Sequence, residues 1–221
     1  MKIYDISPLI DQNSPVFPGD EAFHREETLS FTKGHHLALS WIKSTVHIGA
    51  HTDAPSHYHK DGQTIDQRSL EYYLGPCQVI DVTHVGPRRL QITDIDIRQI
   101  KAPRVLFKTK SFAHRQAFQK EFTSLAPELI SALAQENVCL IGLDTPSVDP
   151  EDSKDLESHQ TVYQHKLAIL EGVDLDEVDE GSYHLIALPL KIAGGDASPV
   201  RAVLIEGQTF HPFSYPGKIH T

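Results

Sequence analysis

Eleven residues in the first quarter of the chain constrain it more than any other stretch. They read His47-Ile48-Gly49-Ala50-His51-Thr52-Asp53-Ala54-Pro55-Ser56-His57 and contain three histidines and one carboxylate. Imidazole and carboxylate are ligand types that suit zinc, manganese or iron, and the stretch has no thiolate. Gly49 is conformationally permissive and Pro55 lacks a backbone donor, so a regular helix is disfavoured. The pattern predicts a strand that ends at about His47 and runs into a loop curled around a metal ion.

The spacing within this stretch supports that interpretation. His51 and Asp53 stand two residues apart, so in an extended segment their side chains point to one side. His47 precedes them closely enough to reach the same ion. The alternative is that these are ordinary surface or core histidines, since the chain has 14 histidines in 221 residues. Four metal-type side chains in eleven residues, interrupted by glycine and proline, favour the metal site.

Length and charge narrow the classes of protein. A chain of 221 residues is expected to form one domain, residues 1–221, with a substantial core. A formal net charge of −10 argues against nucleic-acid binding and against an anionic membrane surface. No segment approaches the roughly 20 apolar residues of a membrane span. Cys77 and Cys139 lie in apolar runs, which predicts buried free thiols in a reducing compartment, the cytoplasm by default.

The hydrophobic pattern predicts a mixed α/β domain. Helices are expected at Ser124–Asn137, with Ser124 as cap and Pro127 in the first turn, and at Leu156–Leu167. Strands are expected at Ile3–Ile10, Leu37–Val46, Gln78–Val85, Val105–Lys108, Val138–Leu143, Leu185–Ile192 and Val200–Ile205. The continuous apolar run of Val138–Leu143 is typical of a strand buried on both faces. The tail from Thr209 to Thr221 is expected to pack on a partner subunit or to fray.

Two further positions draw attention. Glu171 stands inside an apolar segment, where an ionised carboxylate needs a partner, either a metal cation or a structural salt bridge. Phe17 lies between Pro15 and Pro18 in an extended turn, where a hydrophobic plug under a loop is the plainest interpretation.

Several motifs together resemble one known family. The histidine stretch reads His-x-Gly-x-His-x-Asp-x-Pro-x-His, which is similar to the signature of the cyclase-like metal hydrolases, a family that includes bacterial kynurenine formamidases and isatin hydrolases. The resemblance extends from about Ile3 to Ile205, with the motifs in the same order. Further motifs similar to the formamidases are Asp144-Thr145-Pro146-Ser147-Val148-Asp149, His159, Leu167-Ala168-Ile169-Leu170-Glu171-Gly172 and Asp196-Ala197-Ser198-Pro199-Val200-Arg201-Ala202. Among them, Asp144-Thr145-Pro146-Ser147 and Leu170-Glu171-Gly172 narrow the resemblance toward the formamidases.

The resemblance implies a swivelling β/β/α fold, a homodimer and a site for two metal ions. His47, His51 and Asp53 would hold one zinc and His159 the second, with Asp53 and Glu171 shared between them. Manganese is the alternative metal. His57 would donate and accept the proton. Phe17 falls where a formamidase usually has a tryptophan facing the substrate, so an aromatic ring is kept but the indole N–H is lost.

The activity that the resemblance implies is zinc-dependent hydrolysis of N-formyl-L-kynurenine to L-kynurenine and formate in tryptophan degradation. A metal-bound hydroxide would attack the formyl carbon while His57 moves the proton. One alternative is a related metal-dependent hydrolase of a cyclic amide such as isatin, which the phenylalanine at position 17 keeps open. Another is a metal-binding protein without catalysis. His57 argues against that last class, since a structural metal site has no need of a proton carrier.

Overall fold

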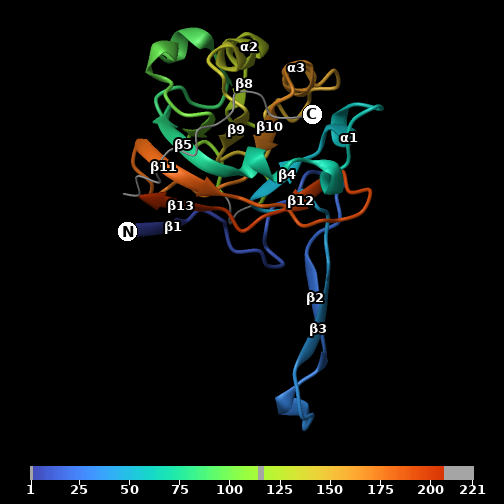
Figure 1. Cartoon of the computed structure of the whole chain (residues 1–221). Helices are drawn as coiled ribbons and strands as arrows, with labels where there is room; N and C mark the ends of the chain where they lie inside the picture. The colour runs from blue at the N-terminus through green and yellow to red at the C-terminus, as the bar shows by residue number, and fades with distance from the viewer. Residues whose placement is uncertain (1, 114–116, 207–221) are drawn as a thin grey trace.

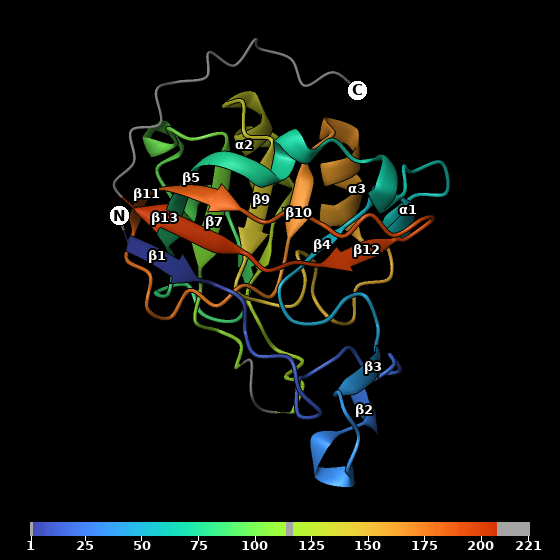
Figure 2. The same ribbon diagram turned by 60° about the horizontal axis from the view of Figure 1, so that its bottom comes forward.

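A seven-stranded mixed sheet forms the body of the protein in the computed structural model, which describes residues 2–113 and 117–206. Its strand order is β1-β13-β11-β5-β7-β9-β10 (Figures 1 and 2). These strands are β1 (Lys2–Asp5), β5 (Leu74–Asp81), β7 (Arg104–Lys108), β9 (Leu140–Leu143), β10 (Ala168–Leu170), β11 (Gly181–Ile186) and β13 (Val203–Glu206). The predicted α/β class is confirmed.

The sheet has an antiparallel half and a parallel half. Strands β1, β13, β11 and β5 pair antiparallel, whereas β5, β7, β9 and β10 pair in parallel. Every residue of β7 and β9 is buried, as a parallel strand covered on both faces requires. The expectation of a doubly buried strand over Val138–Leu143 is thereby confirmed, with the strand itself beginning at Leu140.

Alternate residues of the parallel strands enter two different hydrophobic clusters. On β7, Val105 and Phe107 pack in the cluster that includes the helix residues Leu129 and Val162, whereas Leu106 packs in the opposite cluster. Helices α2 (Pro127–Gln135) and α3 (Glu157–His165) lie side by side on the sheet face to which Val105 and Phe107 point (Figure 1). The two clusters therefore bury both faces of the parallel half of the sheet.

Helix α2 begins later than its sequence suggested. Ser124 is not its cap, because Ser124 and Leu125 form the short strand β8 (Ser124–Leu125), which pairs with β6 (Arg89–Leu90). Ala126 takes the N-cap position without a side-chain hydrogen bond, and Pro127 opens the helix. The remaining helices are single turns, namely α1 (Pro55–Tyr58), η1 (Phe31–Lys33), η2 (Ile65–Gln67), η3 (Leu70–Tyr73), η4 (Ile92–Asp94) and η5 (Ile97–Gln99).

A two-stranded arm projects from the body (Figure 1). It consists of β2 (His24–Leu29) and β3 (Leu39–Lys43), and every residue of β3 is exposed. The strand expected over Leu37–Val46 therefore ends at Lys43 and not at His47. Strand β4 (His51–Asp53) follows the arm in the sequence and pairs with the distant strand β12 (Ala197–Pro199). The two form a small antiparallel sheet beside β10.

Other bounds also differ from expectation. The first strand ends at Asp5, not Ile10, and the strand expected over Leu185–Ile192 is β11, which begins at Gly181 and ends at Ile186. Cys77 and Cys139 are buried free thiols, as predicted. The tail expected at 209–221 lies outside the described residues. Within the described part of the chain, no helix has the length and apolar character to cross a membrane.

Candidate metal centre

The histidine stretch contains a strand where a loop was expected. His51 and Asp53 stand on β4, and their side chains share one side of it, which is the geometry that a two-residue spacing predicts. The backbone of His51 forms an antiparallel bridge with Glu171, through hydrogen bonds from His51 N to Glu171 O (3.0 Å) and from Glu171 N to His51 O (2.9 Å). This bridge brings Glu171, which directly follows β10, to the histidine stretch.

The absence of a side chain at Gly172 makes that approach possible. Gly172 has a φ of +65°, and a Cβ atom there would lie 2.2 Å from the carbonyl oxygen of Gly49. Gly49 itself has a φ of +58°. A side chain at Gly172 would push the segment from His47 to His51 away from the end of β10, whereas one at Gly49 would lie 3.1 Å from Ile10 Cγ1.

The remaining predicted residues arrive on two helices. His57 lies on α1, directly after β4, and His159 lies on α3. His159 Nε2 is 3.5 Å from Asp53 Oδ2 and 4.0 Å from Glu171 Oε1. The ring centroid of His57 is 4.2 Å from that of His47. The structure thus brings together all six polar side chains that the sequence singled out.

Hydrogen bonds orient two of the imidazoles. His51 Nδ1 is 2.9 Å from the carbonyl oxygen of Gly49, and His159 Nδ1 is 2.7 Å from Asp149 Oδ2. The carbonyl and the carboxylate can only accept, so Nδ1 is the donor in both rings, and in its neutral form each ring turns the lone pair of Nε2 inward. His51 Nε2 lies 3.2 Å from Glu171 Oε2 and 3.7 Å from Asp53 Oδ1. Two lone pairs and two carboxylates converge, which is the arrangement of a cation site.

The electrostatics of the buried groups point the same way. Asp53 Oδ1 is buried without a hydrogen bond of good geometry, and its close neighbour is the ion-pair contact with His47 Nδ1 at 3.0 Å. Burial raises the pKa of Asp53, but the neighbouring imidazoles of His159 and His47 outweigh it and hold that pKa well below its usual range. Burial lowers the pKa of His159, but Asp149 and Asp53 outweigh it and raise that pKa to about 10. The buried carboxylates are stabilised by nearby positive charge, which protonated imidazoles or a metal ion can supply.

The donor set therefore fits a divalent metal. Imidazole nitrogens and carboxylate oxygens suit zinc or manganese. Among the described residues, three groups place one ligand atom each within 4.8 Å of one another: His47 with His51 and Asp53, Asp53 with His57 and His159, and His47 with His57 and Asp196. The first group is one that the sequence predicted as a set.

Two carboxylates beside the cluster were not predicted as site residues. Asp196 Oδ2 lies 3.1 Å from His47 Nε2 and 3.6 Å from His57 Nδ1. Asp149 is fully buried against His159. Both occur in motifs that carry the family resemblance, so that resemblance was the available signal. Their contacts span 149 residues for the pair His47–Asp196 and 10 for His159–Asp149, and no local periodicity reports either.

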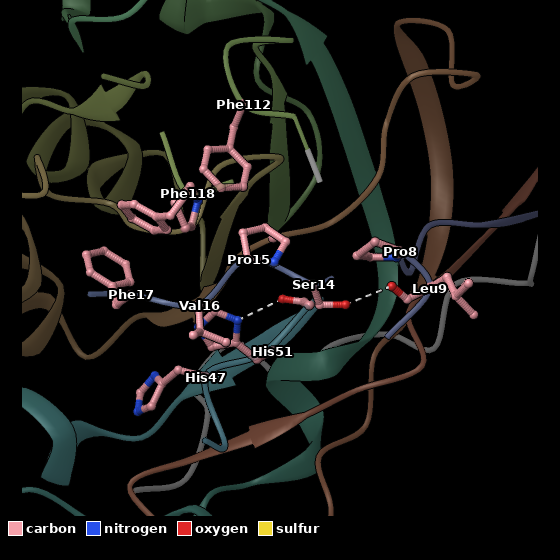
Figure 3. Close-up of a pocket in the computed structure, with 13 residues that line it drawn as sticks. Pro8, Leu9, Ser14, Pro15, Val16, Phe17, His47, His51, Phe112 and Phe118 are labelled. Carbon is pink, nitrogen blue, oxygen red and sulfur yellow. Dashed lines mark hydrogen bonds between the residues drawn. The ribbon is translucent and has the colours of Figure 1, made fainter. Parts of the chain in front are cut away.

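A pocket opens beside the cluster. It holds about 410 Å³ of space, part of it open to solvent, and His47 and His51 contribute to its lining. Phe17, Phe112 and Phe118 line it as well, and Figure 3 shows their rings on one side, above the two histidines in that view. Phe17 thus lies in a pocket wall. Phe112 and Phe118 were not anticipated, because nothing in their own segment marks them.

Sequence comparison shows which known proteins the chain is similar to. The cyclase family profile matches residues 4–150. Kynurenine formamidase from Bordetella pertussis is 44% identical over 205 residues, which is 93% of this chain and 98% of the relative. Kynurenine formamidase from Polaromonas naphthalenivorans is 44% identical over 93% of this chain and 92% of its own.

Solved structures share the fold. A structure described as a potential metal-dependent hydrolase with cyclase activity superposes with a TM-score of 0.80 at 33% identity, covering 94% of this chain and 98% of the other. Isatin hydrolase A from Ralstonia solanacearum superposes with a TM-score of 0.78 at 22% identity, covering 93% and 92%. The latter likeness concerns the fold alone, and it agrees with the cyclase-like architecture that was expected.

The chain belongs to the cyclase family of metal-dependent hydrolases. Its relatives at 43–44% identity place it among the kynurenine formamidases of that family, and it is an amide-hydrolysing enzyme.

Proposed function

We propose that this enzyme hydrolyses N-formyl-L-kynurenine to L-kynurenine and formate, a step of tryptophan degradation. The observation that carries the proposal is the identity of 44% with kynurenine formamidases over 93% of the chain. The cluster of histidines and carboxylates beside a pocket with aromatic walls supports it.

Two zinc ions are the proposed cofactors, with manganese as the alternative. His47, His51 and Asp53 would hold one ion and His159 the other, while Asp53 and Glu171 would contact both. Support comes from the inward lone pairs of His51 and His159 and from the unsatisfied oxygen of Asp53. A divalent metal ion supplies a water of lowered pKa and polarises a carbonyl oxygen.

His57 is the proposed proton carrier. Its side chain is 35% exposed at the rim of the cluster, so it can face substrate and solvent. Asp196 Oδ2 lies 3.6 Å from His57 Nδ1 and can orient the ring. The imidazole takes a proton from the attacking water and delivers it to the aniline nitrogen, so that the C–N bond breaks and formate and the free amine leave.

The test of the function is an assay of formate release by metal-loaded protein, with N-formylkynurenine and isatin as parallel substrates. We expect rapid formate release from the first, no ring opening of the second, loss of activity on chelation and recovery with zinc. Opening of isatin without formate release would assign the chain to the cyclic amide hydrolases. Absence of both reactions in the metal-loaded protein would leave only a metal-binding role.

A homodimer and a cytoplasmic location complete the proposal. The buried free thiols of Cys77 and Cys139 suit a reducing compartment. The arm of β2 and β3 supports the dimer, because a two-stranded hairpin on its own is only marginally stable in water. Its apolar side chains are exposed, including Leu39 at 53% and Trp41 at 45%. Contact with a second copy would cover them.

Replacing both of these arm residues by serine (Leu39→Ser with Trp41→Ser) is expected to shift the protein from dimer to monomer. The measurement is the molar mass by light scattering after gel filtration at micromolar concentration. Leu70→Ser is the control, because Leu70 is 54% exposed on the body of the protein. A dimer that persists in the arm variant would place the subunit interface elsewhere.

A further inference from the structure

Three phenylalanine rings from two separate loops form a continuous wall of the pocket. Phe17 comes from the turn between Pro15 and Pro18, and its ring centroid lies 4.7 Å from that of Phe118. The centroid of Phe118 lies 5.7 Å from that of Phe112. All three side chains are half-buried, so their rings are partly open to the pocket (Figure 3).

The loop that carries Phe112 is fixed at its start. Asp144, at the carboxyl end of β9, accepts hydrogen bonds from the backbone N–H groups of Thr109 and Lys110, both at 2.8 Å, and from the Thr109 hydroxyl at 2.5 Å. The hydroxyl of Ser111 accepts a hydrogen bond from Thr123 N at 2.8 Å. The end of the buried strand thus sets where this loop leaves the sheet.

A buried ring supports the wall from behind. Phe122 is 4% exposed, and its ring meets Phe112 and Phe118 edge-on, with interplanar angles of 89° and 86°. Edge-to-face and tilted contacts of this kind are favoured between aromatic rings. Phe118 is therefore held between a buried ring and Phe17, and it lies in the same pocket lining as His47 and His51.

We infer that Phe118, with Phe112 and Phe17, selects amides whose amine portion is an aryl ring, and that Phe118 is a specificity-determining residue. This inference rests on the proposed function. A planar ring can pack against the phenyl wall in offset or edge-to-face contact while its formamide group reaches the neighbouring histidines. An aliphatic side chain in place of Phe118 keeps the pocket apolar but offers no ring contact.

The test is Phe118→Leu in the metal-loaded full chain. We expect KM for N-formylkynurenine to rise roughly tenfold, kcat to change less than twofold, and binding of the aryl product kynurenine to weaken by the same factor. Phe118→Tyr, which keeps the ring, should restore values close to those of the unaltered chain. Leu70→Ala is the control, because Leu70 is 54% exposed on the body of the protein and does not line the pocket.

Two results would overturn the inference. The first is an unchanged KM and unchanged kynurenine binding in Phe118→Leu while the unaltered chain releases formate, which would leave the proposed function standing and make the rings a hydrophobic plug. The second is an unaltered chain that neither releases formate nor binds kynurenine, in which case the proposed function fails and the aryl selectivity fails with it.

Discussion

Replacing His57 by alanine is expected to lower kcat/KM for N-formylkynurenine by about 10² to 10⁴, the range that a positioned proton carrier contributes. Metal content and the free energy of unfolding should stay close to those of the unaltered chain, because the His57 side chain is 35% exposed and lies at the rim of the cluster. The measurements are steady-state kinetics, metal analysis and thermal unfolding of the same preparations.

His59→Ala is the control for this prediction. His59 stands two residues further along, and its ring stacks on Tyr163 with centroids 3.8 Å apart, outside the metal cluster. The His59→Ala variant also loses one imidazole group, but His59 is not among the proposed metal ligands. Its kinetics should therefore change less than twofold. Partial recovery of the His57 variant by added imidazole would support a proton-carrying role.

A different outcome would reassign His57. The residue also forms a group with Asp53 and His159 whose ligand atoms lie within 4.8 Å of one another. If His57→Ala loses one metal ion together with its activity, His57 is a ligand. If it retains full hydrolysis, another group must move the proton, and Asp196 would be the next carboxylate to replace.

The ligand stretch could be found in the sequence because its chemistry is local. His51 and Asp53 are two residues apart, and strand geometry alone puts them on one side. The same local logic mistook the secondary structure: Gly49 and Pro55 suggested a loop, yet β4 forms because its partner β12 and the backbone of Glu171 supply hydrogen bonds from distant segments. Pro55 then opens a single helical turn, which is the position where proline costs a helix nothing.

Other features escaped prediction because they also depend on distant segments. Ser124 had the chemistry of a helix cap, but its backbone pairs with Arg89, so it belongs to strand β8. Phe118 carries no motif, and its place in the wall depends on a loop anchored by Asp144. Asp149 was visible only as part of a motif, because its role depends on how α3 packs. Contacts of this kind are set by tertiary structure, which hydrophobic periodicity does not encode.

Asp149→Asn is expected to weaken metal binding at the His159 position by about 10- to 100-fold, the usual effect of removing the carboxylate behind a metal-bound histidine. Asp149 Oδ2 accepts the Nδ1–H of His159 at 2.7 Å and its backbone N–H at 3.0 Å. This pair of contacts fixes both the position of the ring and the tautomer that turns Nε2 toward Asp53. Burial raises the pKa of Asp149, but the bonds with His159 outweigh it and lower that pKa to about 2, so the group acts as a carboxylate.

The affinity would be measured by competition with a chromophoric chelator, which reports binding independently of turnover. A loss of about 1–3 kcal/mol in the free energy of unfolding should accompany the change, since a buried carboxylate with several donors is replaced by an amide. That loss alone does not alter metal affinity in a protein that stays folded at the assay temperature. The two effects are therefore measured separately, unfolding on the metal-free protein and affinity on the folded one.

The Glu157→Gln variant distinguishes two roles of Asp149, namely orienting the ring of His159 and binding Arg89. Arg89 Nη2 lies 3.0 Å from Asp149 Oδ1 and 3.0 Å from Glu157 Oε2, so both carboxylates hold the same guanidinium. The side chain of Glu157 is 63% exposed, and an exposed pair contributes at most about 1 kcal/mol. If orientation of His159 is what matters, Asp149→Asn weakens metal binding and Glu157→Gln does not. Equal losses in both variants would show that Arg89 anchors the start of α3 and that the carboxylate–histidine contact is incidental.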